Sequence, residues 1–170
     1  LFTYQLKRLV DLLYLRSPYD GRYALDKPHV VVVGYLTPAT VSDFLREFYY
    51  EDRQREVTAR LKVVLLDARI DKDVALLVHA ARYAGKVFYL RGSPMLTRDL
   101  VRAGAPAARA FFILSDPYAL DADAADKTAL LEALSVKKSR PTLFTLVQLV
   151  QPENKSHLHK IGAEIVVALN

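Results

Sequence analysis

The chain has 170 residues, of which 52% are hydrophobic, and its 24 basic and 19 acidic side chains give a net charge of +5. A chain of this length fits one domain, and the absence of cysteine excludes disulfides, thiolate metal sites and cysteine nucleophiles. No apolar run reaches the roughly 18 to 20 residues that cross a bilayer, and the basic residues are too scattered to predict nucleic-acid binding, so we expect a soluble domain in the cytosol.

The first predicted element is an amphipathic helix over residues 1–14. Its apolar residues recur at helical spacing, at Phe2, Leu6, Leu9, Val10 and Leu13. A polar loop over residues 17–22 follows. The helix could pack on the domain, lie on a membrane surface or end an upstream segment. We treat residues 1–28 as an N-terminal helix and linker, and residues 29–170 as the main domain.

The apolar run His29–Gly34 predicts a buried strand, and a proline opens a helix predicted over residues 38–50. A buried strand that leads through a tight turn into a helix opens a dinucleotide-type fold. The glycine pattern of such folds is degraded here, since Gly34 keeps the first position, Leu36 takes the second and Ala39 lies one residue short of the third. A bound pyrophosphate would therefore meet a side chain rather than bare backbone.

The same strand and helix unit repeats along the rest of the chain. Short apolar runs predict five more strands, over residues 61–66, 86–90, 110–114, 141–147 and 164–169. Helical spacing and stop signals predict four more helices, over residues 71–83 before Gly85, from 96 to a stop at Gly104, over 121–137, and over 152–160 before Gly162. Six alternating strands predict an α/β fold, a Rossmann-like doubly wound parallel sheet with an appended N-terminal helix.

Few side chains in the sequence indicate a catalytic or binding site. Asp67, at the end of the second strand, is placed to accept a ribose hydroxyl, or is a solvated turn residue. Four acidic residues could converge on a hard cation, and helix capping explains most of them more simply: Asp116, Asp121, Asp123 and Asp126. The four histidines have no partners at ligand spacing, and no nucleophile elbow is present, so we do not expect an enzyme.

Several segments, taken in order, resemble the first cytosolic RCK domain of Slo-family ligand-gated potassium channels, with the sodium-activated branch the most similar. They are residues 29–34, 43–49, 87–93, 99–103, 112–115 and 124–126, and the run Gln151-Pro152-Glu153-Asn154-Lys155. Each motif is short, and the collinear set is more specific than any member. Residues 9–23 are similar to the family's connector between the pore-lining helix and the first RCK strand.

The resemblance implies the N-terminal Rossmann lobe of a gating ring, without catalysis and on the cytoplasmic face of a membrane. Its partners would be the other RCK lobes of a homotetrameric channel, and the pore helices through the N-terminal segment. Binding of an intracellular cation, sodium or calcium, would act on the pore through this ring. The family's magnesium-site glutamates are replaced by Lys62 and Val87, so magnesium sensing is not expected.

The candidate site residues fall into two sets. The resemblance places Asp52 at the position of an aspartate that helps to hold calcium in the calcium-activated branch. We add Asp121 and Asp123 as weaker metal candidates, and Gly34 and Asp67 as nucleotide candidates.

Three other functions are alternatives to a gating-ring lobe. They are a soluble nucleotide-binding Rossmann module, a remnant oxidoreductase, and a domain that serves assembly alone.

Overall fold

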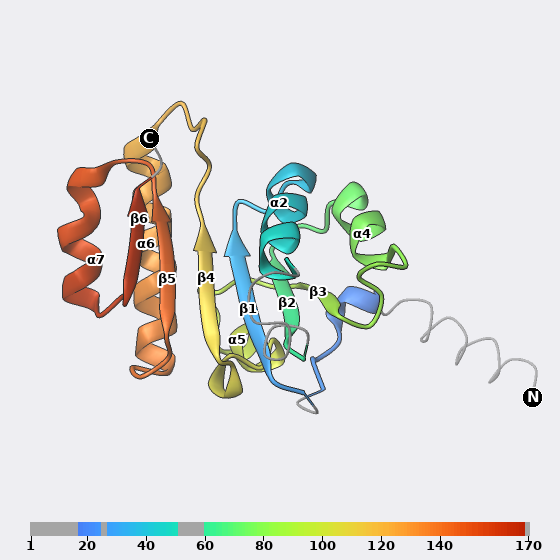
Figure 1. Ribbon diagram of the computed structural model, residues 1–170. Coiled ribbons are helices and arrows are strands. Elements are labelled where there is room, and N and C mark those ends of the chain that lie inside the picture. The colour runs from blue at the N-terminus through green and yellow to red at the C-terminus, as the bar shows by residue number, and fades with distance from the viewer. Residues whose placement is uncertain (1–16, 25–26, 51–59, 169–170) are drawn as a thin grey trace, which may run out of the picture.

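The computed structural model describes residues 17–24, 27–50 and 60–168. Its centre is a sheet of six parallel strands in the order β3-β2-β1-β4-β5-β6 (Figure 1). The strands are β1 His29–Gly34, β2 Lys62–Asp67, β3 Val87–Arg91, β4 Ala110–Leu114, β5 Thr145–Leu149 and β6 Ile165–Ala168. This confirms the predicted fold class.

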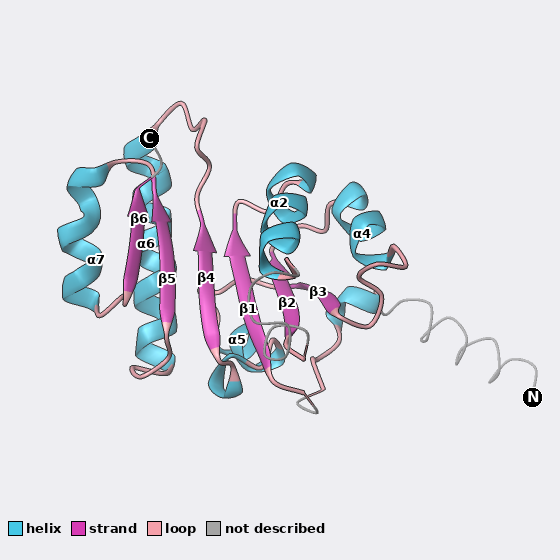
Figure 2. Cartoon of the chain, viewed as in Figure 1, coloured by secondary structure: helices cyan, strands magenta, loops and turns pink. Residues whose placement is uncertain are grey.

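Helices join successive strands, as parallel strands require (Figure 2). The α-helices are α2 Pro38–Phe48, α4 Lys72–His79, α5 Thr97–Arg102, α6 Ala122–Ser139 and α7 Lys155–Ile161. The described residues also form three short 3₁₀ helices, η1 Pro18–Asp20, η2 Ala105–Ala107 and η3 Pro152–Asn154. In the described part of the chain, no helix is both long enough and apolar enough to span a membrane.

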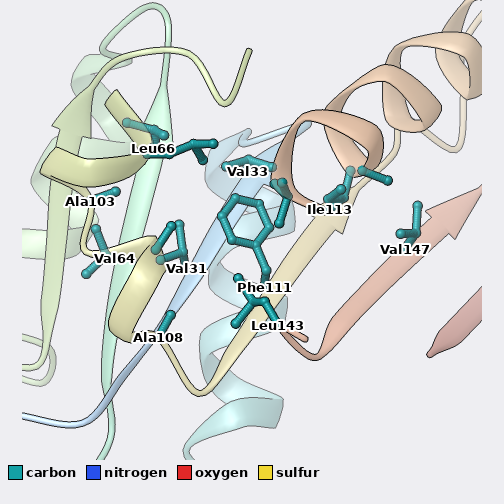
Figure 3. Close-up of a cluster of buried hydrophobic side chains, with 14 of the residues drawn as sticks. Val31, Val33, Val64, Leu66, Ala103, Ala108, Phe111, Ile113, Leu143 and Val147 are labelled. Atoms are coloured by element: carbon teal, nitrogen blue, oxygen red, sulfur yellow. The ribbon is translucent and has the colours of Figure 1, made fainter. Parts of the chain in front are cut away.

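The sheet is covered on both faces, because alternate residues of each strand enter different cores. Val31 and Val33 of β1 pack in one core with α5, α6 and α7, while Val30 and Val32 pack in the other with α2 and α4. Figure 3 shows the ring of Phe111 from β4 in the first core, among side chains of β1, β2 and Leu143.

Two predicted elements differ most from the structure, and the helix predicted over residues 152–160 begins as the 3₁₀ helix η3 and becomes α-helical at Lys155. The predicted helix over residues 71–83 ends at His79, because Ala80 takes an extended ψ of 145°; Gly85 has a positive φ of 71° but lies beyond the helix. The predicted strand over residues 141–147 begins only at Thr145 and runs to Leu149, because the Leu143 N–H donates to the Arg140 carbonyl in a turn. The predicted helix over residues 1–14 lies outside the described residues.

Candidate functional site

The order of the strands reverses between β1 and β4, and this switch point is where open α/β sheets bind ligands at their carboxyl edge. Gly34 and Tyr35 lie between two hollows at this edge. One, of about 340 Å³, is lined by Leu36, Thr37, Asp67, Arg69, Ile70 and Asp71. The other, of about 240 Å³, is lined by Leu114, Ser115, Asp116, Ala125, Thr128, Ala129 and Glu132. Together they form the switch-point crevice.

Gly34 is required by strand packing. Its φ is +96°, and a Cβ built there would lie 2.1 Å from the Leu114 carbonyl oxygen of β4. The next residue, Tyr35, donates its N–H to the same oxygen at 2.8 Å. The strands are therefore joined at the point where a phosphate would approach the backbone in a dinucleotide-binding fold. Leu36, at the second glycine position, is 6% exposed and packs in the core with α2 and α4.

The start of α2 offers few free donors to an anion. Pro38 has no N–H, and the Thr40 N–H already donates to the Thr37 hydroxyl at 3.2 Å. A helix binds phosphate through free N–H groups of its first turn. Pro38 and Thr40 together remove about half of the free N–H groups at this helix start, which weakens the case for a pyrophosphate at this turn.

Asp67 lies at the crevice, as predicted, and its carboxylate already has partners. It accepts the Arg69 N–H at 3.1 Å and the Tyr89 hydroxyl at 3.3 Å. Burial raises its pKa, although both hydrogen bonds act in the opposite direction. These contacts make Asp67 a turn-forming residue; no contact tests its predicted role toward a ribose.

Glu132 is a site residue that sequence reasoning missed. It lies on α6, lines the crevice, is 8% exposed, and its Oε2 has no hydrogen-bond partner among the described residues. Burial, followed by repulsion from Asp67, raises its pKa to about 7. In the sequence, Glu132 lies in the middle of a predicted helix between Ala129 and Ala133, and this pattern is only a weak indication that its side chain is buried.

Most acidic residues of the predicted cluster accept hydrogen bonds from the protein's own backbone. Asp121 caps α6 by accepting the Ala124 N–H at 2.9 Å, and Asp116 accepts the Tyr118 N–H at 2.9 Å. Asp123 is exposed in the first turn of α6. No group of three or more acidic or histidine side chains in the described part of the chain could hold a metal. Asp52 lies outside the described residues.

Asp126 connects two motifs of the resemblance. Its carboxylate accepts the N–H groups of Val150 at 2.7 Å and Gln151 at 3.0 Å, and the Asn154 side-chain amide at 2.8 Å. It is 3% exposed. The motif that ends at Asp126 and the motif that contains Asn154 therefore form one structural unit between α6 and the end of β5.

The second candidate region is the N-terminal segment where it meets the sheet. Arg102 of α5 donates to the carbonyls of Gly21 at 2.9 Å and Tyr19 at 3.3 Å, and its own carbonyl accepts the Tyr23 N–H at 2.9 Å. Asp99 is 4% exposed and orients Arg102 through an ion pair of 2.9 Å. We call residues 17–24, with these contacts, the docked segment.

Aromatic contacts also fix the same segment to β3 and to the start of β1. The Tyr19 ring meets Tyr89 edge to face at 5.8 Å, and the Tyr23 ring meets Phe88 at 5.0 Å and His29 at 4.5 Å. Such pairs add to the burial of apolar area. The segment is therefore attached to the domain through charge, backbone and ring contacts, so a displacement of α5 or β3 would be transmitted to it.

Comparison with known proteins shows what the chain resembles. The calcium-activated potassium channel slowpoke-like RCK domain family matches residues 26–147. The chain is 32% identical over 163 residues to the calcium-activated potassium channel slo-1 of Caenorhabditis elegans, covering 95% of this chain and 14% of that protein. It thus spans about one-seventh of the length of this curated relative.

Solved structures of other proteins have a fold similar to that of this chain. The human SLO3 gating ring superposes with a TM-score of 0.67 at 25% identity, over 84% of this chain and 24% of that chain. A structure of GsuK bound to ADP gives a TM-score of 0.65 at 19% identity, over 96% of this chain and 37% of that chain. At that identity the second match shows the fold alone. These matches do not separate the calcium-activated from the sodium-activated branch, so the branch stays a prediction.

Proposed function

The chain belongs to the calcium-activated potassium channel slowpoke-like RCK domain family, and on this premise we propose that it is a non-catalytic regulatory domain of a potassium-channel gating ring. It lies at the cytoplasmic face of a membrane and couples the binding of an intracellular cation to opening of the pore. Its partners are the other RCK lobes of a homotetrameric channel. Residues 1–28 lead from the pore to the domain at residues 29–170.

The observation that carries this proposal is the docked segment. A domain that gates a pore needs a rigid attachment to the chain that leads there. Arg102 binds two carbonyls of that chain and is itself oriented by the buried Asp99. An ion gates through such an attachment only if it binds more tightly to one arrangement of the ring than to the other.

The test is to record potassium current from the full-length channel while intracellular sodium or calcium is varied. We expect activation by one of these cations, with sodium favoured by the resemblance. Arg102→Gln should shift the half-activating concentration at least about fivefold, because couplings of this kind are worth about 1 to 3 kcal/mol. The cation titration also decides which ion is sensed.

Arg98→Gln is the matched control. Arg98 lies one turn earlier on α5, its side chain is 80% exposed, and its contact with Asp99 is 3.6 Å long. It should leave the activation curve unchanged. Absence of potassium current under every cation condition would overturn the proposed function, and equal shifts in both variants would overturn the role of the docked segment.

The second candidate is a nucleotide-binding role for the switch-point crevice. It is supported by the position of the crevice and by the related fold of GsuK, whose structure was solved with ADP. Titration calorimetry with NAD, NADH and ATP tests it. Because Thr37 and Pro38 reduce the donors at this turn, we expect no heat at millimolar ligand; binding would favour the nucleotide-binding module.

A further inference from the structure

A second hollow lies at the opposite, amino edge of the sheet, and cationic side chains surround it. It measures about 380 Å³ and is lined by Lys27, Pro28, His29, Ala107, Ala108, Arg109 and Arg140. Lys27 comes shortly before β1, Arg109 directly before β4, and Arg140 directly after α6. Three separate segments thus bring three positive charges to one hollow, which we call the amino-edge pocket.

Within the described residues, these charges have no acidic partner. Lys27, Arg109 and Arg140 form no ion pair with the carboxylates of residues 17–24, 27–50 and 60–168, and no acidic residue within these ranges lines the pocket. Elsewhere in the same ranges, Arg46, Arg91, Arg102 and Lys137 each face a carboxylate. Like charges that converge repel one another unless an anion lies between them.

Arg140 is held in place for such an anion. Its Nη1 donates to the carbonyls of Pro106 at 2.8 Å and Ala108 at 3.0 Å. Its Nη2 and Nε have no partner among the described residues. A guanidinium fixed at one nitrogen loses little entropy when its other donors bind, and its planar fork matches phosphate oxygens.

The floor of the pocket is rigid and uncharged. His29 is 1% exposed, its Nε2 lies 3.1 Å from the Gly104 carbonyl, and its ring packs on Tyr23. Burial lowers its pKa, which keeps the ring neutral near physiological pH. The attraction to an anion therefore comes from the three side chains at the rim.

From this arrangement we propose that the amino-edge pocket binds a phosphate group, carried either by a free phosphorylated molecule or by a phosphorylated lipid headgroup. Three converging cations suit a group with more than one negative charge, whereas a carboxylate is satisfied by one arginine. The pocket is a single hollow rather than a long basic stripe with aromatic residues, so it does not suit a nucleic-acid strand. The proposal does not depend on the proposed gating function.

The test uses the 170-residue chain in two arms. Calorimetry with inorganic phosphate and with inositol trisphosphate measures the free source. Flotation with phosphatidylcholine vesicles, with and without phosphatidylinositol bisphosphate, measures the lipid source. Binding should weaken at high salt, because the rim charges are open to solvent.

Two variants and one control decide the outcome. Arg140→Gln should weaken binding about tenfold, and the double variant Lys27→Gln/Arg109→Gln at least as much. The double variant leaves the Arg140 hydrogen bonds intact, so it remains informative if Arg140→Gln folds poorly. Lys72→Gln/Lys127→Gln is the charge-matched control, since Lys72 begins α4, Lys127 lies in the second turn of α6, and both helices follow the carboxyl ends of strands.

Each possible result either supports or overturns the proposed phosphate site. Loss of binding in the double variant but not in the control supports the pocket, and the arm in which binding occurs identifies the source of the phosphate. Equal loss in variant and control would mean attraction by net charge alone and would overturn the proposal. Failure to bind in both arms would overturn it as well.

Discussion

The two edges of the sheet use their charged groups in opposite ways. At the carboxyl edge, Asp67, Asp116 and Asp126 accept hydrogen bonds from the protein's own backbone. At the amino edge, Lys27, Arg109 and Arg140 face an open pocket without a carboxylate partner in the described part of the chain. Apart from Glu132, whose Oε2 has no partner among the described residues, the edge at which this fold usually binds ligands is thus the more self-contained of the two. A ligand site should be sought where charge is left unbalanced.

Gly34→Ala tests whether the carboxyl edge is closed by strand contact. The new Cβ would lie 2.1 Å from the Leu114 oxygen, at a φ of +96°. We expect the free energy of unfolding to fall by about 4 kcal/mol, since both a backbone clash and a left-handed conformation are involved. Urea denaturation measures it.

Gly85→Ala is the matched control for that variant. Gly85 also has a positive φ, of +71°, but a Cβ there meets no atom within 4 Å. It should cost only about 1 kcal/mol, the conformational part alone. Equal losses in the two variants would mean that contact between β1 and β4 does not require the glycine.

Asp126→Ala tests whether the acids of this edge are structural. The change leaves the Val150 N–H, the Gln151 N–H and the Asn154 amide without their carboxylate acceptor. We expect a loss of about 3 kcal/mol, because several charge-assisted hydrogen bonds to a buried group disappear together. Asp123→Ala, three residues earlier and exposed, should change the stability by less than about 0.5 kcal/mol; a similar loss there would contradict this reading.

Glu132 gives the carboxyl edge a dependence on pH. Its pKa of about 7 in the folded protein exceeds the ordinary value of 4.5 for a glutamate, so the folded state binds a proton more tightly than the unfolded state does. Its contribution is therefore neutral below pH 4.5, and becomes progressively destabilising as the pH rises toward 7. Glu132→Gln should raise the free energy of unfolding by about 3 kcal/mol at high pH, and by little in acid.

Thermal or urea unfolding of both proteins across this pH range measures the difference. Because the other titrating groups are common to the two, subtracting their stability curves isolates Glu132. A difference that does not vary with pH would show that the carboxyl group is not shifted, and that the unpartnered Oε2 finds a hydrogen bond in solution.

Glu132 also marks the limit of what the sequence could predict. Continuous apolar strands and the alternation of elements predicted the fold, because buried parallel strands have few other ways to be covered. The position of Asp67 at the crevice followed from the end of its strand. Glu132 lies far from that strand in the sequence, and only the packing of α6 on the sheet brings it to the crevice.

The amino-edge pocket was hidden for the same reason. The sequence shows only isolated positive charges here, because its three cationic residues are widely separated along the chain: Lys27, Arg109 and Arg140. The crossovers of the sheet bring them together, because each lies near the start of a strand or the end of a helix at one edge. Residue types and local spacing carry no information about such convergence.

Asp121→Ala separates helix capping from metal binding. Asp121 Oδ1 accepts the Ala124 N–H at 2.9 Å, and its removal should cost about 1 kcal/mol. Asp121→Ser should recover most of the loss, since a hydroxyl caps as well but ligates calcium weakly. A stabilisation by millimolar calcium or sodium that disappears in both variants would instead support the predicted cation role of Asp121.

Removing charged side chains at the amino edge should not lower the stability of the fold, in contrast to the losses expected for Asp126→Ala and Asp121→Ala. Lys27→Gln/Arg109→Gln removes two of three converging charges that lack acidic partners in the described ranges. Because repulsion within the pocket is relieved, stability at low salt should stay constant or rise by about 0.5 kcal/mol, and the gain should vanish at high salt. Added inorganic phosphate should raise the melting temperature of the unmodified chain and not that of the variant, since a ligand stabilises only the state that binds it. A variant less stable than the parent at low salt would show that these cations have partners in solution, and the contrast between the two edges would then fail.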